Sequence, residues 1–126
     1  MLRILCIEDD AETRVLIKKG LESLGMSVDT AWGGEKGVQA ALTGRFDCVL
    51  LDLMMSGMDG FQVLHALKTQ GLTRALPVIL VTAREDQDSR RRAKVAGADG
   101  YVVKPFRLNE LAQVIHAAVE HVNVQA

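Results

Sequence analysis

Short apolar runs alternate along the chain with longer segments of helical periodicity. The runs have the length of strands, and several are apolar at consecutive positions, which is typical of strands buried on both faces of a sheet. The expected strands are residues 2–7, 27–32, 46–53, 77–82 and 101–103. The expected helices are residues 11–24, 33–43, 61–67, 88–96 and 108–122. The last helix has the clearest pattern, because Leu108, Leu111, Ile115 and Val122 belong to one apolar stripe.

This alternation gives five βα units without an internal repeat or linker. It predicts an α/β fold in which a parallel sheet carries helices on both faces. Right-handed crossovers leave only a few strand orders open. We expect the doubly wound, flavodoxin-like (βα)5 arrangement with strand order 2-1-3-4-5, an order taken from the known folds of this class.

Composition agrees with one folded domain covering residues 1–126. A chain of 126 residues can bury one sizeable core, and 48% hydrophobic with 25% charged residues is typical of globular proteins. The net charge of −1 provides no overall field for nucleic acid or an anionic membrane. We therefore expect no direct nucleic-acid binding by this chain.

The sequence gives no sign of export or membrane insertion. The longest apolar runs are far shorter than the ~20 residues that a membrane helix needs. Three acidic residues, at positions 8–10, come before any signal-peptide core could form. Cys6 and Cys48 lie inside apolar runs and are predicted to be buried thiols, which fits a cytoplasmic protein.

Candidate chemistry lies at the carboxyl ends of the expected strands, where open α/β sheets bind their ligands. Strand one is followed by Glu8, Asp9 and Asp10, and strand three by Asp52. Strand four ends in Thr82, and strand five is followed by Lys104. Because strands one and three are neighbours in the expected order, their acids should converge on one pocket.

Each of these residues also has an ordinary structural interpretation. Asp10 is a good helix N-cap, which we favour over a ligand role. Thr82 and Lys104 could be a strand residue and a surface lysine. Asp52 is harder to explain in this way, because it directly follows an apolar run, where desolvation of a carboxylate is costly.

Taken together, the strand ends suit a phosphoryl group. Three carboxylates in one pocket repel one another, and Mg²⁺ with its oxygen ligands relieves that repulsion. A lysine and a threonine hydroxyl suit anionic oxygens, and phosphoryl transfer depends mainly on positioning and charge neutralisation. A carboxylate can itself be the nucleophile and form an aspartyl phosphate.

With these residues identified, the chain resembles the receiver domains of two-component response regulators over essentially its whole length. Five motifs match in order, and their combined spacing makes the resemblance specific. They are Glu8-Asp9-Asp10, Leu51-Asp52-Leu53-Met54-Met55 through Met58-Asp59-Gly60, Val81-Thr82-Ala83, Gly97-Ala98-Asp99-Gly100-Tyr101 and Lys104-Pro105-Phe106.

The resemblance implies a role for each acidic residue. Asp52 would accept the phosphoryl group. Asp9 and Asp52 would bind Mg²⁺ together with the backbone carbonyl of Met54, and Glu8 would act through a metal-bound water. Lys104 would pair with a phosphoryl oxygen.

The resemblance also implies a switch. The Thr82 hydroxyl would turn to the phosphoryl group, and Tyr101 would rotate inward with it. The peptide bond between Lys104 and Pro105 would be cis. One departure lies in the loop after Asp52, where Ser56 replaces a proline that is common in the family, so the sequence constrains this loop less.

Two further features have simpler interpretations. Arg90-Arg91-Arg92 suggests a partner surface, but a basic run on a helix is more often a solvated face, which we favour. Trp32 is expected to pack at the end of the second strand.

The function implied is a phospho-activated switch in two-component signalling. A sensor histidine kinase or histidine phosphotransfer protein would phosphorylate Asp52 in a Mg²⁺-dependent reaction. The change would alter the face formed by the fourth helix, fifth strand and fifth helix, which would bind a downstream effector protein. The protein would be no enzyme beyond catalysing its own phosphorylation and dephosphorylation.

Two alternatives belong to other functional classes. A Mg²⁺-dependent aspartyl-phosphate phosphatase of the haloacid-dehalogenase type places a second acid two residues after its nucleophile, where this chain has Met54. A flavin or nucleotide carrier would need a phosphate-binding glycine loop after strand one, where this chain has acids.

Overall fold

The five apolar runs form one parallel sheet in the computed structural model, which describes the backbone of residues 1–125 and the side chains of residues 1–121. The strands are β1 (Arg3–Ile7), β2 (Ser27–Ala31), β3 (Cys48–Leu51), β4 (Val78–Thr82) and β5 (Gly100–Val103). Their order is β2-β1-β3-β4-β5, and every neighbouring pair is parallel. The predicted fold class and strand order are therefore confirmed.

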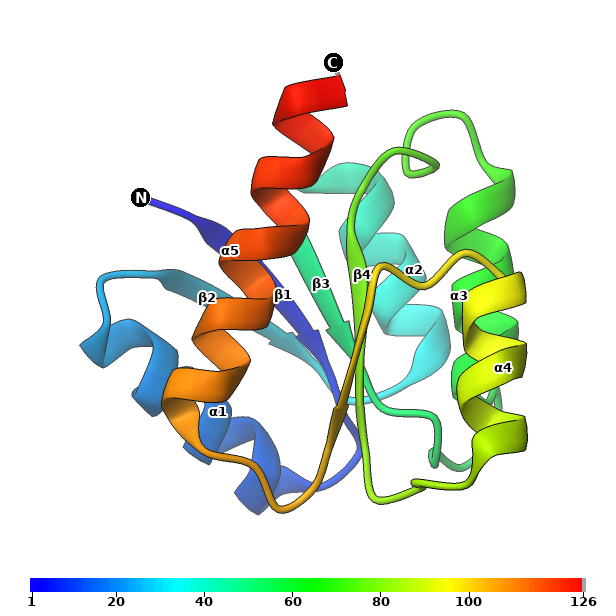
Figure 1. Cartoon of the computed structure of the whole chain (residues 1–126), viewed down its shortest axis with the longest axis horizontal. Helices are drawn as coiled ribbons and strands as arrows, with labels where there is room; N and C mark the ends of the chain where they lie inside the picture. Colours follow the sequence, from blue (N-terminus) through cyan, green and yellow to red (C-terminus); the bar gives the residue numbers. More distant parts are fainter. Residues whose placement is uncertain (126) are drawn as a thin grey trace.

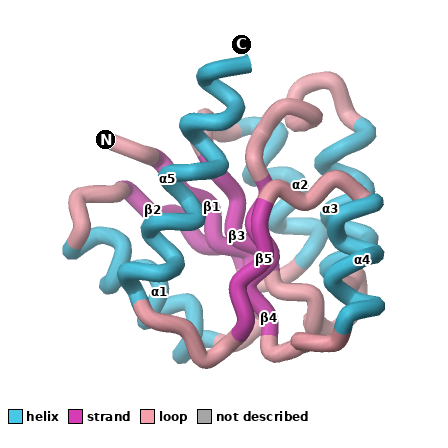
Figure 2. The backbone as a smooth tube through the Cα atoms, in the orientation of Figure 1, coloured by secondary structure: helices cyan, strands magenta, loops and turns pink. Residues whose placement is uncertain are grey.

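A helix follows each strand, and the helices cover both faces of the sheet (Figures 1 and 2). They are α1 (Ala11–Ser23), α2 (Gly34–Thr43), α3 (Gly60–Thr69), α4 (Gln87–Val95) and α5 (Leu108–Gln125). Helices α1 and α5 lie on one face, and α2, α3 and α4 lie on the other (Figure 1). The side chain of Val122, which the sequence places in the apolar stripe of α5, lies outside the described side chains.

Each face of the sheet has its own apolar core. Alternate residues of β1 point to opposite faces, so that Ile4 joins one core and Leu5 the other. On the first face they pack with α1 and α5 residues such as Leu111, and on the second with α2, α3 and α4 residues such as Leu67. This double burial explains why the central strands are apolar at consecutive positions.

Local contacts account for the differences at the predicted boundaries. β3 begins at Cys48 rather than at residue 46, because the Asp47 carboxylate accepts a hydrogen bond from the Arg3 N–H at 2.8 Å. α3 begins at Gly60 rather than at residue 61, because Asp59 and Gln62 form a reciprocal capping box at its start. Trp32 directly follows β2 and is 61% exposed, and its ring packs at the strand end against Lys36, whose Nζ lies 4.3 Å from the ring centre, rather than in the core.

The pairing register brings the carboxyl ends of β1, β3, β4 and β5 to one edge of the sheet, the lower edge in Figure 1. Ile7 pairs with Leu51, so Glu8 and Asp52 leave neighbouring strands at the same level. Thr82 pairs with Val103, which places Lys104 next to the end of β4. The topology alone therefore assembles these residues from four distant parts of the sequence.

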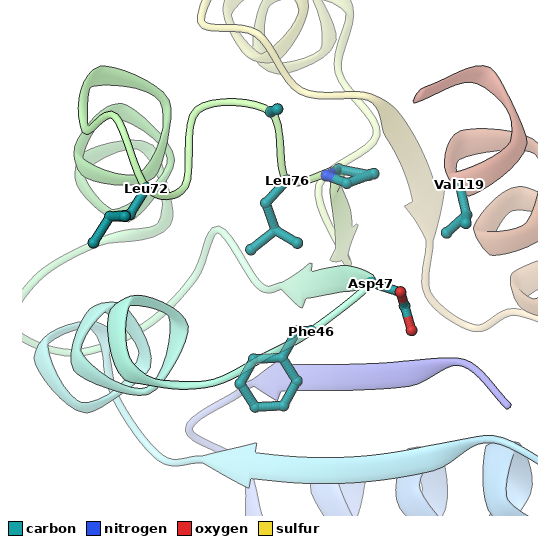
Figure 3. A pocket seen from close by; sticks show the side chains of 7 residues that line it. Phe46, Asp47, Leu72, Leu76 and Val119 are labelled. Carbon is teal, nitrogen blue, oxygen red and sulfur yellow. The ribbon is translucent and has the colours of Figure 1, made fainter. Parts of the chain in front are cut away.

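A hollow of about 270 Å³ lies at the opposite edge of the sheet. It is lined by Phe46 and Pro77, which precede β3 and β4, and by α3–β4 loop residues and Val119 of α5. Figure 3 shows the side chains around it. The hollow is therefore separate from the carboxyl edge.

None of the helices in the described residues combines the length and the apolar character needed to cross a bilayer.

Candidate functional site

Lys104 connects two buried carboxylates at the carboxyl edge of the sheet. Its Nζ contacts Oε1 of Glu8 and lies 2.9 Å from Oδ2 of Asp52. Glu8 is 3% exposed and Asp52 is 7% exposed. Because buried carboxylates are costly without partners, Lys104 is the group that makes this pair tolerable.

The three groups strongly affect one another's ionisation. Burial raises the pKa of Glu8 to about 7, and the neighbouring Asp52 carboxyl adds to the rise. Burial alone would raise the pKa of Asp52, but hydrogen bonds with Glu8, the Met54 N–H and Lys104 outweigh burial and hold this pKa below its usual value. For Lys104, burial would lower the pKa, and its hydrogen bonds with Glu8 and Asp52 outweigh that effect and raise it. Asp52 is therefore an ionised carboxylate near neutral pH, next to a charged lysine.

The loop after Asp52 is held close to the start of α3. Oδ1 of Asp52 accepts a hydrogen bond from the Met54 N–H at 3.0 Å, and the Gly60 N–H donates to the Leu53 carbonyl at 3.1 Å. A Cβ atom on Gly60 would lie 2.5 Å from the Asp52 carbonyl oxygen. Glycine at this position therefore permits the close approach that fixes the backbone of Asp52.

Asp9 is hydrogen-bonded to Ser56 of the β3–α3 loop. Its Oδ2 accepts hydrogen bonds from the N–H and from the hydroxyl of Ser56, each at 2.8 Å. In the part of the chain that the structure describes, no three His, Cys, Asp or Glu side chains are grouped so that they could hold a metal ion. Asp9 therefore contacts Ser56, whereas Glu8 and Asp52 contact Lys104. That the three acids hold one metal ion together stays a prediction.

Arg14 is a second cation at this edge, and no motif in the sequence pointed to it. Its Nη1 donates hydrogen bonds to the backbone carbonyls of Glu8 and Asp9, both at 2.7 Å. The signal was available in the sequence, since Arg14 lies one helical turn after Asp10, which caps α1 by accepting a hydrogen bond from Thr13. Arg14 thus fixes the backbone that presents both acids.

Thr82 and Tyr101 are connected through Arg84. The hydroxyl oxygen of the fully buried Thr82 accepts a hydrogen bond from the Arg84 N–H at 3.3 Å. The Tyr101 hydroxyl donates to the Arg84 carbonyl at 2.7 Å. One residue of the β4–α4 loop, Arg84, therefore contacts both predicted switch residues.

The peptide bond between Lys104 and Pro105 is cis.

The arginine run on α4 does more than face solvent. The Arg90 guanidinium lies 4.7 Å from the centre of the Tyr101 ring, and that of Arg92 lies 4.0 Å from the centre of the Phe61 ring. All three arginines are exposed, as the sequence predicts. Two of them also make cation–π contacts, which a run of basic residues does not by itself predict.

Comparison with known proteins gives a consistent result. Residues 4–116 match the response regulator receiver domain family. The transcriptional regulatory protein HprR of Escherichia coli K12 is 39% identical over 92% of this chain and 51% of its own length. The transcriptional regulatory protein QseB of Escherichia coli O157:H7 is 39% identical over 99% of this chain and 56% of its own length. The chain thus spans about half the length of these curated relatives.

Solved structures show the same fold. The chemotaxis protein CheY4 of Vibrio cholerae superposes with a TM-score of 0.89 at 27% identity, over 94% of this chain and 98% of that one. The receiver domain of the sensor histidine kinase PA1611 of Pseudomonas aeruginosa superposes with a TM-score of 0.87 at 29% identity, over the same shares, and holds a magnesium ion in its active site cleft. With the strand order and the carboxyl-edge cluster, these matches establish that the chain belongs to the response regulator receiver domain family of two-component signalling.

Proposed function

We propose that residues 1–126 form a single receiver domain in which Asp52 accepts a phosphoryl group from a sensor histidine kinase or a histidine phosphotransfer protein. The contact between Lys104 and Asp52 carries this proposal. It keeps a nucleophilic carboxylate ionised at the carboxyl edge of a parallel sheet, beside a cation suited to phosphoryl oxygens.

The donor types at this edge fit Mg²⁺. Asp9 and Asp52 offer carboxylate oxygens, Met54 offers a backbone carbonyl, and Glu8 would contribute through a bound water. These hard oxygen donors are the ones that Mg²⁺ prefers, and Mg²⁺ usually keeps several waters and also binds phosphate oxygens. When bound, the cation would neutralise charge on the phosphoryl group.

Asp52 and Lys104 would take part directly in the phosphoryl transfer. One Asp52 carboxylate oxygen forms the bond to phosphorus while the bond from phosphorus to the nitrogen of the donor histidine breaks. Lys104 then pairs with a phosphoryl oxygen instead of with the free carboxylate. Asp52 lies at the edge of the core, so the donor must approach from the loop side, where Met54 is exposed.

Arg84 connects the phosphorylation site to the face formed by α4, β5 and α5, because it contacts both Thr82 and Tyr101. If the Thr82 hydroxyl turns to the phosphoryl group, it releases the Arg84 N–H, and the same residue's carbonyl holds the Tyr101 hydroxyl. Rotation of Tyr101 would also break its contact with Arg90 and so change the α4–β5–α5 face. This face would bind a downstream effector protein, and this chain would not bind nucleic acid directly.

The test is phosphorylation by a small-molecule donor. The chain is incubated with Mg²⁺ and acetyl phosphate, and its intact mass is measured. We expect one added phosphoryl group that hydroxylamine removes, and no adduct on Asp52→Asn. Asp29→Asn, an exposed position on β2, is the matched control and should be modified like the wild type. An adduct retained on Asp52→Asn, or turnover of the donor without a retained adduct, would contradict the proposal.

A further inference from the structure

Ser56 makes a paired hydrogen-bond contact with Asp9 that the proposed function does not use. Both of its donors, the backbone N–H and the hydroxyl, bind the same oxygen of Asp9 at 2.8 Å. Ser56 is exposed and Asp9 is half-buried, so the contact joins the β1–α1 loop to the β3–α3 loop across the mouth of the site.

We propose that Ser56 is a positioning residue that competes with the divalent cation for the Asp9 carboxylate and thereby weakens Mg²⁺ binding. The inference rests on the proposed function, in which Asp9 is a metal ligand. The observation behind it is separate from the Lys104–Asp52 contact that carries the proposed function. Lys104 contacts Glu8 and Asp52, whereas Asp9 is bound by Ser56.

The competition follows from charge and geometry. A carboxylate oxygen that accepts two hydrogen bonds is already well stabilised, so a cation gains less from binding it. A cation that binds the same Asp9 oxygen would also weaken both Ser56 hydrogen bonds. A proline at position 56, the residue common in the resembling family, offers neither an N–H nor a hydroxyl and cannot form this contact.

The backbone of the loop suits these substitutions. Among the described residues, left-handed φ angles occur only at glycines, so position 56 avoids the region that proline cannot adopt, and Gly57 takes the positive φ of 75°. Ser56→Ala removes the hydroxyl alone, and Ser56→Pro removes both donors. Ser23→Ala is the matched control, because the Ser23 hydroxyl donates to a backbone carbonyl at the far end of α1.

The experiment is calorimetric titration of each 126-residue chain with MgCl₂, without a phosphodonor. Loss of one hydrogen bond to a charged group, worth about 1.5 kcal/mol net, should tighten Mg²⁺ binding by Ser56→Ala roughly tenfold. Ser56→Pro should bind more tightly still, and Ser23→Ala should match the wild type. Equal Mg²⁺ affinities in all chains, or weaker Mg²⁺ binding by Ser56→Ala, would overturn the proposal. Weaker binding would show that Ser56 orients Asp9 for the cation.

A second measurement follows the contact itself. Hydrogen exchange of the Ser56 amide, observed by NMR, should become faster when the wild type is saturated with Mg²⁺, because the amide loses its acceptor. An unchanged exchange rate in the Mg²⁺-bound protein would contradict the competition. A wild type that binds no Mg²⁺ and accepts no phosphoryl group would instead refute the proposed function, so the two failures are distinguishable.

Discussion

Lys104 shows at the scale of one residue how this fold makes a reactive carboxylate. The lysine follows β5, whereas its two partners follow β1 and β3. Its charge offsets the desolvation of two acids that are almost fully buried. Phosphorylation would replace one carboxylate with a more highly charged group on the same partner, so the site responds to modification without a new cation from the protein.

Burial has the opposite consequence for the cysteines. Cys6 and Cys48 are 1% and 0% exposed, as the sequence predicts, and burial raises the pKa of each thiol to about 12. Only the thiolate reacts rapidly, so a raised pKa makes both residues inert. We expect no labelling by a thiol reagent such as Ellman's reagent at pH 8 in the native protein, and labelling of both after unfolding in guanidinium.

The same pKa shifts predict a dependence of stability on pH. A thiol with a raised folded-state pKa contributes stability that is fully present below its ordinary value of 9.0 and is lost as the pH rises toward 12. The thiol contribution to the free energy of unfolding should therefore decline only at alkaline pH. Rapid labelling of either cysteine in the native protein at pH 8 would contradict a raised thiol pKa.

At the scale of elements, the β3–α3 connection is the part that packing controls most closely. Gly60 is the first residue of α3, and a Cβ there would lie 2.4 Å from the Leu53 Cα. The capping box of Asp59 and Gln62 fixes the same helix start from the other side. The position of Asp52 therefore depends on how α3 begins as well as on β3.

Gly60→Ala tests this dependence. The clash is with backbone atoms, so we expect a loss of about 1–3 kcal/mol in the free energy of unfolding, as for other overpacked sites. Urea denaturation measures it. Gly71→Ala is the control, because a Cβ at Gly71 meets no atom within 4 Å. Equal stabilities of the two variants would show that the loop can relax around the added methyl group.

At the scale of the whole molecule, the sheet is shared by two cores that do not include the same side chains. Alternate residues of the central strands enter opposite cores, so neither core can form without the strands that complete the other. This arrangement predicts that the chain unfolds as one cooperative unit.

Leu111→Ala in α5 and Leu67→Ala in α3 test the coupling from the two faces, because both leucines are fully buried. Each should cost about 2–5 kcal/mol. For each variant, circular dichroism and Trp32 fluorescence should give the same unfolding midpoint. Leu16→Ala, at a position that is 72% exposed, should change stability by less than about 0.5 kcal/mol. Separate midpoints for the two probes would show that the faces unfold independently.

The sequence by itself determined the class of the fold and the strand-end residues, because both depend on local pattern. Continuous apolar runs such as residues 48–51 mark strands buried on both faces, and residues such as Asp52 directly follow them. The cis geometry at Lys104–Pro105 and the individual site roles came only from the family resemblance, since no local pattern encodes them.

Only the tertiary structure decided which of these groups touch. Lys104, which follows β5, pairs with Glu8 and Asp52, which follow β1 and β3. Asp9, adjacent to Glu8 in sequence, contacts Ser56 instead. Arg14 reaches back from α1 to two carbonyls. These choices depend on side-chain directions and on loops that approach each other in space, and a sequence pattern specifies which strand a residue follows but not which neighbour its side chain contacts.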